Sequence, residues 1–156
     1  MGRTLKLWGP VILWMGIIFM VSTDLGSADH TSRIIEPVLR WIYPAISAET
    51  VSLVHLLIRK CGHFTEYAIL ALLVLRTAQL PAKTFTRSRE FRAAGVAWLI
   101  AALYASTDEF HQSFVPARTA SIYDVLIDSS GAFTALAAAL LWRYIRAKLP
   151  ALMRRR

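Results

Sequence analysis

The sequence has little cysteine, little charge and no long polar segment. Its single cysteine, Cys61, excludes an internal disulfide. Charged residues make up 18% of the 156 residues, against about a quarter in a typical soluble domain. Hydrophobic residues make up 56%, and the mean hydropathy is +0.46. Repeats, low-complexity segments and domain boundaries are also absent from the sequence. This composition predicts one domain over residues 1–156 that is not an ordinary soluble protein.

The apolar residues gather in four stretches, and the charged residues fall mainly between them. The stretches cover residues 7–23, 62–80, 93–114 and 122–145. A helix of about 20 residues crosses the ~30 Å hydrocarbon core of a bilayer, so each stretch is marginal to adequate in length. No small-residue cleavage site follows the first stretch closely, and we expect it to remain as a span. The sequence therefore predicts an all-α membrane protein, a four-transmembrane-helix bundle.

The connection between the first two stretches carries two amphipathic segments. Residues 32–46 read SRIIEPVLRWIYPAI, and residues 48–60 read AETVSLVHLLIRK. Their apolar residues recur at helical spacing, which is typical of short helices that lie along a membrane interface. We expect Pro37 and Pro44 to break the first segment into pieces.

The basic and acidic residues gather on opposite sides of the predicted spans. Thirteen of the 18 basic residues lie before the first stretch, around the 81–92 connection, or at the end of the chain. Nine of the ten acidic residues and all four histidines lie at or near the other side. The positive-inside rule therefore predicts that both termini and the 81–92 connection are cytoplasmic. Because the basic residues flank spans, the net charge of +8 is explained by anionic lipid and not by nucleic acid.

Polar side chains recur at helical spacing where the stretches reach the outer side. The second stretch opens with K-x-x-H-x-x-E-Y from Lys60, the third closes with D-E-x-H-Q from Asp108, and the fourth opens with Asp124 and Asp128. A charge facing lipid costs about 2.5–3.5 kcal/mol at the bilayer centre. We therefore expect the polar side chains of the three stretches to face one another. The predicted charged pocket is lined by Lys60, His63, Glu66, Tyr67, Asp108, Glu109, His111, Gln112, Arg118 and Asp124.

Three segments of the sequence carry a family resemblance. KCGHFTEYAILALL, DEFHQSFVPARTASIYDVL and DSSGAF, in this order, resemble the VanZ-like family of bacterial integral membrane proteins over roughly residues 55–140. The resemblance implies the bacterial cytoplasmic membrane and, in the founding members, a role in resistance to glycopeptides, teicoplanin especially. It also implies the ten pocket residues as the polar site, and it implies no reaction. The family commonly has Asn where this chain has Asp128, which adds an acid to the pocket.

Three interpretations of the pocket remain open at this point. If the protein is an enzyme, the imidazoles and acids of the pocket are the candidate general bases and acids, namely His63, Glu66, Asp108, Glu109 and His111. If it only binds a ligand, the candidate contacts are Lys60, Tyr67, Gln112, Arg118 and Asp124. In the third interpretation the polar residues form a structural network between helices and bind nothing.

The expected partners are membrane lipids, a lipid-linked cell-wall precursor or a lipoglycopeptide, with no nucleic acid and no cofactor. His63-x-x-Glu66 and Asp108-x-x-His111 could together offer four metal ligands. However, the sequence contains no H-E-x-x-H motif, and pairs of this kind are more often hydrogen-bonded proton partners. The sequence alone therefore favours a site without a metal.

The predicted orientation can be tested by cysteine labelling. In a Cys61→Ala background, Pro116→Cys is expected to react with a membrane-impermeant maleimide in intact cells, because Pro116 lies in an outer connection. Ser88→Cys, in the 81–92 connection, is the matched control and is expected to react only after the cells are permeabilised. Labelling of Pro116→Cys only in permeabilised cells would contradict the predicted orientation.

Overall fold

The computed structural model describes residues 2–23, 28–79, 86–116, 118 and 120–153, and within them the regular secondary structure is all α-helix. The all-α prediction is therefore confirmed. In chain order the helices are α1 (Gly2–Ser22), α2 (Ala28–Ile42), α3 (Ala48–Gln79), α4 (Arg87–Gln112) and α5 (Ile122–Met153).

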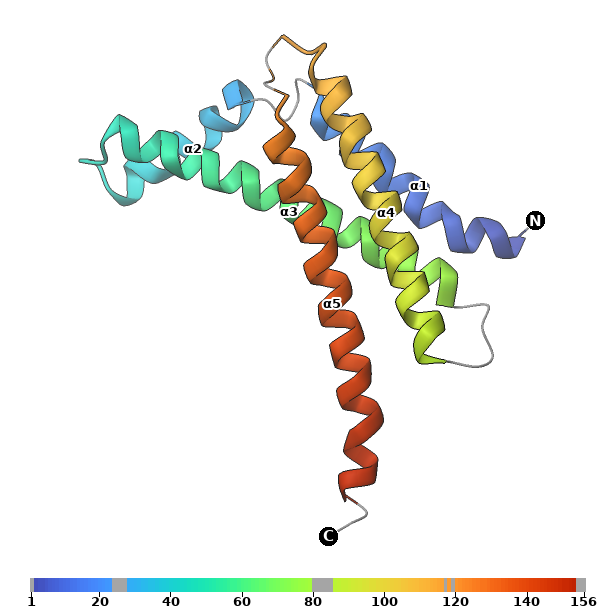
Figure 1. Cartoon of the computed structure of the whole chain (residues 1–156). Helices are drawn as coiled ribbons and strands as arrows, with labels where there is room; N and C mark the ends of the chain where they lie inside the picture. Colours follow the sequence, from blue (N-terminus) through green and yellow to red (C-terminus); the bar gives the residue numbers. More distant parts are fainter. Residues whose placement is uncertain (1, 24–27, 80–85, 117, 119, 154–156) are drawn as a thin grey trace.

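Helix α3 is the element against which the others pack (Figure 1). It crosses α5, and this contact is the most extensive in the structure. Helix α4 packs on both α3 and α5, α1 lies on α3 and touches α4, and α2 packs against α3. The C-terminal part of α5 extends beyond the other helices (Figure 1). The centre of the molecule is therefore the region where α1, α3, α4 and α5 meet.

The helices approach closely because small residues lie between them. On α4, Ala97, Ala101 and Ala105 are fully buried at a spacing of four, which leaves a flat strip for a neighbouring helix. On α5, Gly131 lies directly against α3. A Cβ atom added at Gly131 would lie 2.1 Å from the carbonyl oxygen of Phe64. Only glycine fits at this crossing.

Three aromatic side chains connect the helices by donating hydrogen bonds to backbone carbonyls. Trp14 Nε1 of α1 donates to the carbonyl of Glu66 on α3 (2.9 Å). The Tyr104 hydroxyl of α4 donates to the carbonyl of Met15 on α1 (2.7 Å). Trp98 Nε1 of α4 donates to the carbonyl of Ser129 on α5 (3.0 Å). Each bond uses the second lone pair of a helical carbonyl, so it fixes the rotation of one helix against another without breaking the helix.

The connection between the first two predicted spans differs from expectation in two ways. Helix α2 continues through Pro37, so the prediction that this proline breaks the segment is wrong, although α2 does end before Pro44. The second amphipathic segment is not a separate short helix, because α3 runs without interruption from Ala48 to Gln79. No proline lies in this range, and a glycine such as Gly62 costs a helix only about 1 kcal/mol.

Two of the described helices are long and apolar enough to cross a membrane, over Thr4–Ser22 and Ile122–Leu149. They correspond to the first and fourth predicted spans. Helices α3 and α4 include the other two predicted spans, but charged residues such as Lys60, Glu66 and Asp108 dilute their apolar character. That α3 and α4 also cross the membrane stays a prediction.

Substitution at Gly131 tests the crossing of α3 and α5. Gly131→Ala is expected to lower the free energy of unfolding by about 1–3 kcal/mol, as overpacking does, because the added methyl group meets the backbone of Phe64. The measurement is thermal or denaturant unfolding in detergent, followed by near-ultraviolet circular dichroism.

Gly95→Ala on α4 is the matched control, since a Cβ atom there meets nothing within 4 Å. This variant is expected to be neutral or more stable by up to about 1 kcal/mol, because alanine favours the helix. Equal unfolding free energies for the two variants would contradict the close crossing.

Candidate functional site

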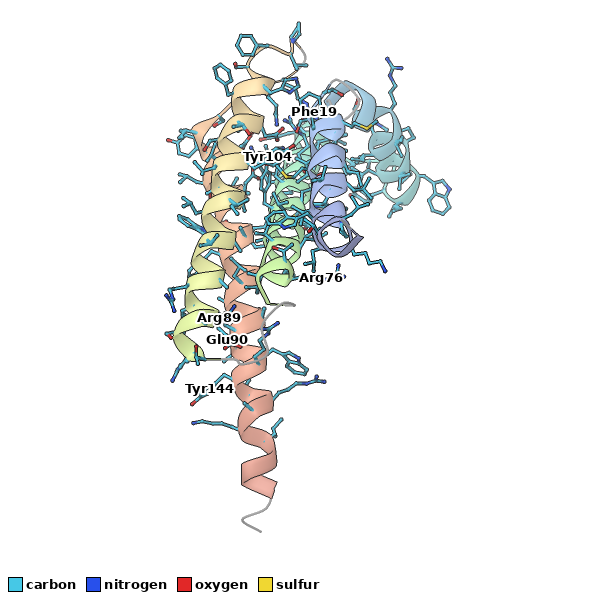
Figure 2. All side chains as sticks on the ribbon, turned by 90° about the vertical axis from the view of Figure 1, so that its right-hand side faces the viewer. Phe19, Arg76, Arg89, Glu90, Tyr104 and Tyr144 are labelled. Atoms are coloured by element: carbon cyan, nitrogen blue, oxygen red, sulfur yellow. The ribbon has the colours of Figure 1, made fainter. Side chains whose placement is uncertain are left out.

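Most of the buried polar side chains gather at one end of the bundle. This end is formed by the C-terminal ends of α1 and α4, the N-terminal end of α5 and the middle of α3. Figure 2 shows Phe19 and Tyr104 toward this end and Arg76, Arg89 and Tyr144 toward the other. The buried polar residues at this end are Ser22, His63, Asp108, Glu109, Gln112, Asp124 and Asp128.

A hydrogen-bond network joins α1 to α4 at this end. The Ser22 hydroxyl donates to Asp108 Oδ2 (2.7 Å). Gln112 Nε2 donates to the same carboxylate oxygen (3.1 Å) and, at 3.4 Å, to the Ser22 hydroxyl. Asp108 is 3% exposed and Gln112 is fully buried, so these bonds compensate for the burial of a carboxylate. Asp108 and Gln112 therefore hold α1 in place.

Two basic residues of the predicted site make contacts between elements. Lys60 of α3 forms an ion pair with the buried Asp124 of α5. Arg118, in the α4–α5 connection, donates from Nε and Nη2 to the carbonyl of Thr23 (3.3 and 3.2 Å), and from Nη2 also to the carbonyl of Val21. Cations near a helix C-terminus interact favourably with the helix dipole. Arg118 thus joins the α4–α5 connection to the end of α1.

A buried His–carboxylate cluster lies between α3, α4 and α5. His63 Nδ1 is 3.3 Å from Asp128 Oδ1, within ion-pair reach, although the alignment is not that of a hydrogen bond. Glu109 faces the same pair, so that one candidate ligand atom of each of the three residues lies within 4.8 Å of the others. Glu109 Oε2 accepts a hydrogen bond from the backbone N–H of Ser121 (2.8 Å). Of all the residues described, this is the group whose donors are closest to a metal-binding arrangement.

Beside this cluster is a small pocket of about 160 Å³. The side chains that define its chemistry are Arg59, His63 and Glu66 of α3 and Arg118 of the α4–α5 connection. Arg59 Nε is buried and makes no hydrogen bond with the described residues. Burial and the nearby charge of Arg59 lower the pKa of the Arg118 guanidinium, against opposing carboxylates. The pocket therefore brings two guanidinium groups near each other, an arrangement that an anion between them would stabilise.

The structure does not bring all the predicted site residues to the pocket. His111 packs against Phe19 of α1, with ring centroids 4.5 Å apart, and does not line the pocket. Tyr67 is fully buried near Asp108, behind the pocket wall. The metal pairing of Asp108-x-x-His111 with His63-x-x-Glu66 does not form, because Asp108 is held by Ser22 and Gln112.

Two important residues are not among the ten predicted lining residues. Asp128, predicted only as an acid added to the pocket, is fully buried beside His63, and its spacing of four from Asp124 was the signal for it. Arg59 lines the pocket, and only its position next to Lys60 pointed to it. Asp24, which the sequence places at the end of the first span, lies outside the described residues.

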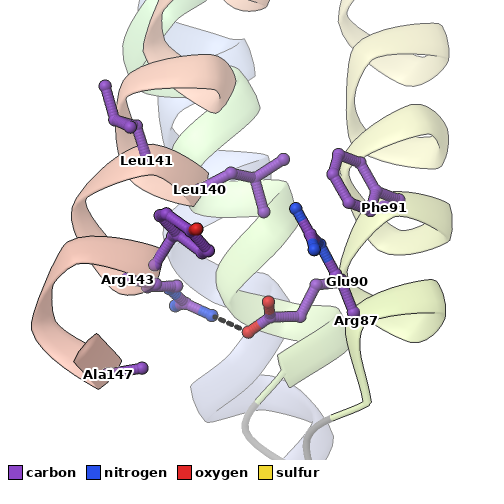
Figure 3. A pocket seen from close by; sticks show the side chains of 8 residues that line it. Arg87, Glu90, Phe91, Leu140, Leu141, Arg143 and Ala147 are labelled. Atoms are coloured by element: carbon purple, nitrogen blue, oxygen red, sulfur yellow. Dashed lines mark ion pairs between the residues drawn. The ribbon is translucent and has the colours of Figure 1, made fainter. Parts of the chain in front are cut away.

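A larger pocket, of about 610 Å³, lies between α4 and α5 toward the opposite end of the molecule. Figure 3 shows Glu90 of α4 facing Arg143 of α5 across it, with Arg87, Phe91 and Leu140 nearby. The Arg143 and Glu90 side chains form an ion pair at 3.6 Å. The charged residues that line this larger pocket are two arginines and one glutamate, and no histidine lines it. It lacks the mixed acid–base character of the other end.

The sequence model of the VanZ/LLP1 family matches residues 7–143. The chain belongs to the VanZ/LLP1 family. The match includes every residue of the cluster and the pocket described above. No curated protein matches this VanZ/LLP1 chain significantly, and no solved structure does.

The network between α1 and α4 predicts a measurable loss of stability in Ser22→Ala. This substitution removes one of the two donors to Asp108 Oδ2, and Asp108 Oδ1 already has no hydrogen bond in the described residues. A buried acceptor that loses its donor costs about 1–3 kcal/mol. The expected result is a decrease of this size in the free energy of unfolding in detergent.

Ser106→Ala on the exposed side of α4 is the control, because its hydroxyl bonds only to Ala102 of the same helix. Its unfolding free energy is expected to stay within about 0.5 kcal/mol of the original chain. If Ser22→Ala were equally neutral, Asp108 would not depend on this network.

Proposed function

We propose that this protein is a multi-pass protein of the bacterial cytoplasmic membrane and that its pocket binds the anionic head group of a lipid-like envelope molecule. The observation that carries the proposal is the small pocket in which Arg59 and Arg118 lie near each other beside His63 and Glu66. The molecules with the required chemistry are an anionic phospholipid, a lipid-linked cell-wall precursor and a lipoglycopeptide of the teicoplanin type. They share a hydrocarbon tail and an anionic head.

The apolar surface of the chain supports a membrane location. Only 11% of the apolar window in α1 and 22% of that in α5 are buried within the protein. Large side chains such as Leu13, Leu103, Phe133 and Trp142 are more than half exposed. Contiguous apolar surfaces of this extent are rare on soluble monomers. A bilayer around the bundle would bury them.

Helix α2 fits an interfacial position. Ile34, Val38, Trp41 and Ile42 follow one another at spacings of four, three and one, which places them on one side of the helix, and all four are at least half exposed. Such a stripe suits the boundary between head groups and acyl chains. Together with the separation of basic and acidic ends, it supports four spans with both termini in the cytoplasm and the polar end outward.

The pocket fits a head group better than a whole ligand. Its volume of about 160 Å³ is well above that of one water molecule but below the roughly 300–1,000 Å³ of pockets that enclose drug-sized molecules. Arg59 can bind phosphate or carboxylate through paired hydrogen bonds, and Arg118, which also donates to carbonyls of α1, adds its positive charge. Glu66 can accept a hydrogen bond from a hydroxyl or amine of the same head group. Val21 and Ile58, both exposed, also line the pocket and offer a path for a tail into the bilayer.

The structural-network alternative accounts for only part of the site. It explains Ser22, Asp108 and Gln112, whose polar groups are bonded to one another. It does not explain the buried Arg59 Nε without a hydrogen bond, or the placement of a second guanidinium nearby. Catalysis with His63 as general base would use the same pocket. It differs from binding in that the ligand would leave chemically changed.

The test is native mass spectrometry of the detergent-purified chain with three ligands: phosphatidylglycerol, undecaprenyl phosphate and teicoplanin. One of them is expected to bind with a stoichiometry of one, and zwitterionic phosphatidylcholine is expected to bind weakly. Arg59→Gln or Arg118→Gln is expected to weaken this binding about 10–100-fold, as loss of a charge-assisted hydrogen bond does.

Arg89→Gln is the matched control, since it removes the same charge from an exposed site at the other end of α4. Circular dichroism verifies that each variant is folded. Equal affinities of the original chain and both pocket variants for all three ligands would overturn the proposal. Release of a ligand with changed mass would identify an enzyme instead of a binding protein.

A further inference from the structure

The cluster of His63, Glu109 and Asp128 carries an inference that does not depend on a lipid ligand. The three residues come from α3, α4 and α5 and are 8%, 5% and 0% exposed. One candidate ligand atom from each lies within 4.8 Å of the other two. The closest measured pair is His63 Nδ1 and Asp128 Oδ1, at 3.3 Å.

These three side chains are buried with incomplete hydrogen bonding. Within the described residues, both carboxylate oxygens of Asp128, one oxygen of Glu109 and Nδ1 of His63 make no hydrogen bond. Buried charges of this kind are normally paired or coordinate a metal. The nearest basic residues are engaged elsewhere, since Lys60 pairs with Asp124 and Arg118 donates to carbonyls of α1. The cluster thus has the donors of a cation site, and among the described residues only the His63 imidazole faces its two carboxylates as a partner.

We propose that His63, Glu109 and Asp128 bind one divalent transition-metal cation. An imidazole with two carboxylates suits zinc or manganese better than calcium or magnesium, which prefer oxygen ligands alone. The 3.3 Å between His63 Nδ1 and Asp128 Oδ1 is about the distance between two ligands of a tetrahedral ion with bonds of about 2.0–2.1 Å.

Glu109 has the arrangement of a metal ligand supported from behind. Its Oε2 accepts the backbone N–H of Ser121, while its Oε1 has no hydrogen bond in the described structure. Hydrogen bonds to the far side of a ligand fix its orientation and are common around bound metals. The site would therefore use Oε1 of Glu109 together with His63 and Asp128.

Three protein ligands leave a coordination position open, as in metal sites that bind water or substrate. His63 belongs both to the cluster and to the wall of the pocket. An ion at this site would thus lie next to the group held by Arg59 and Arg118. It would also connect α3, α4 and α5, so its binding is expected to stabilise the fold.

The test uses the full chain in detergent, purified without chelator and with no histidine tag. Elemental analysis is expected to find close to one zinc or manganese per chain. After chelation, addition of ZnCl₂ or MnCl₂ is expected to raise the unfolding temperature by about 5–10 °C, and MgCl₂ is expected to have a much smaller effect. Asp128→Asn and Glu109→Gln are each expected to lose the bound metal and the stabilisation.

Glu66→Gln is the matched control, because Glu66 lies one turn from His63 on α3 but outside the three-residue cluster. It is expected to keep both metal and stabilisation. The original chain provides the decisive result even if a variant does not fold. Less than about 0.1 metal per chain, with no stabilisation by ZnCl₂ or MnCl₂, would overturn the proposal. Retention of metal by folded Asp128→Asn and Glu109→Gln would overturn it as well.

Discussion

The close crossing of α3 and α5 is the constraint on which the polar end of this protein depends. At Gly131 the backbone of Phe64 occupies the space that any side chain would need. His63 precedes Phe64 on α3, and Asp128 lies one turn before Gly131 on α5, so the crossing sets these two side chains 3.3 Å apart. One turn earlier on each helix it sets Lys60 against Asp124. A wider crossing would leave two acids of α5 without partners in apolar surroundings.

The polar side chains at this end divide into two groups, although both contain buried atoms without a hydrogen bond in the described residues, Asp108 Oδ1 and Gln112 Oε1 among them. Ser22, Asp108 and Gln112 bond to one another, and this group serves to fix α1. The cluster of His63, Glu109 and Asp128 keeps several buried atoms without hydrogen bonds, as does Arg59 in the adjacent pocket. Leaving buried polar atoms unpaired costs about 1–3 kcal/mol each. A fold that retains such groups in one place is more readily explained by a ligand than by stability.

The proposed pocket and the proposed metal site together make this polar end chemically coherent. Two guanidinium groups favour an anion, and a divalent cation beside them would add to the same attraction. The exposed apolar faces of α1 and α5 and the exposed stripe of α2 would hold this end at the level of lipid head groups. Membership of the VanZ/LLP1 family extends over all the helices involved. Such a site would select molecules that combine a charged head with a hydrocarbon tail.

The sequence by itself determined the four apolar helical stretches and the family, because hydrophobic periodicity, apolar length and short motifs are local properties. The four apolar stretches correspond to α1, α3, α4 and α5, and spacings of three and four placed Asp108 with Gln112 and Asp124 with Asp128. Tertiary structure decided which neighbouring helix each set of polar side chains faces. It turned His111 toward Phe19, assigned Asp108 to α1 and paired Asp128 with His63. Sequence spacing fixes which residues share a helix face, whereas the rotation of each helix about its axis follows from contacts such as Gly131 with Phe64, which only the packed chain contains.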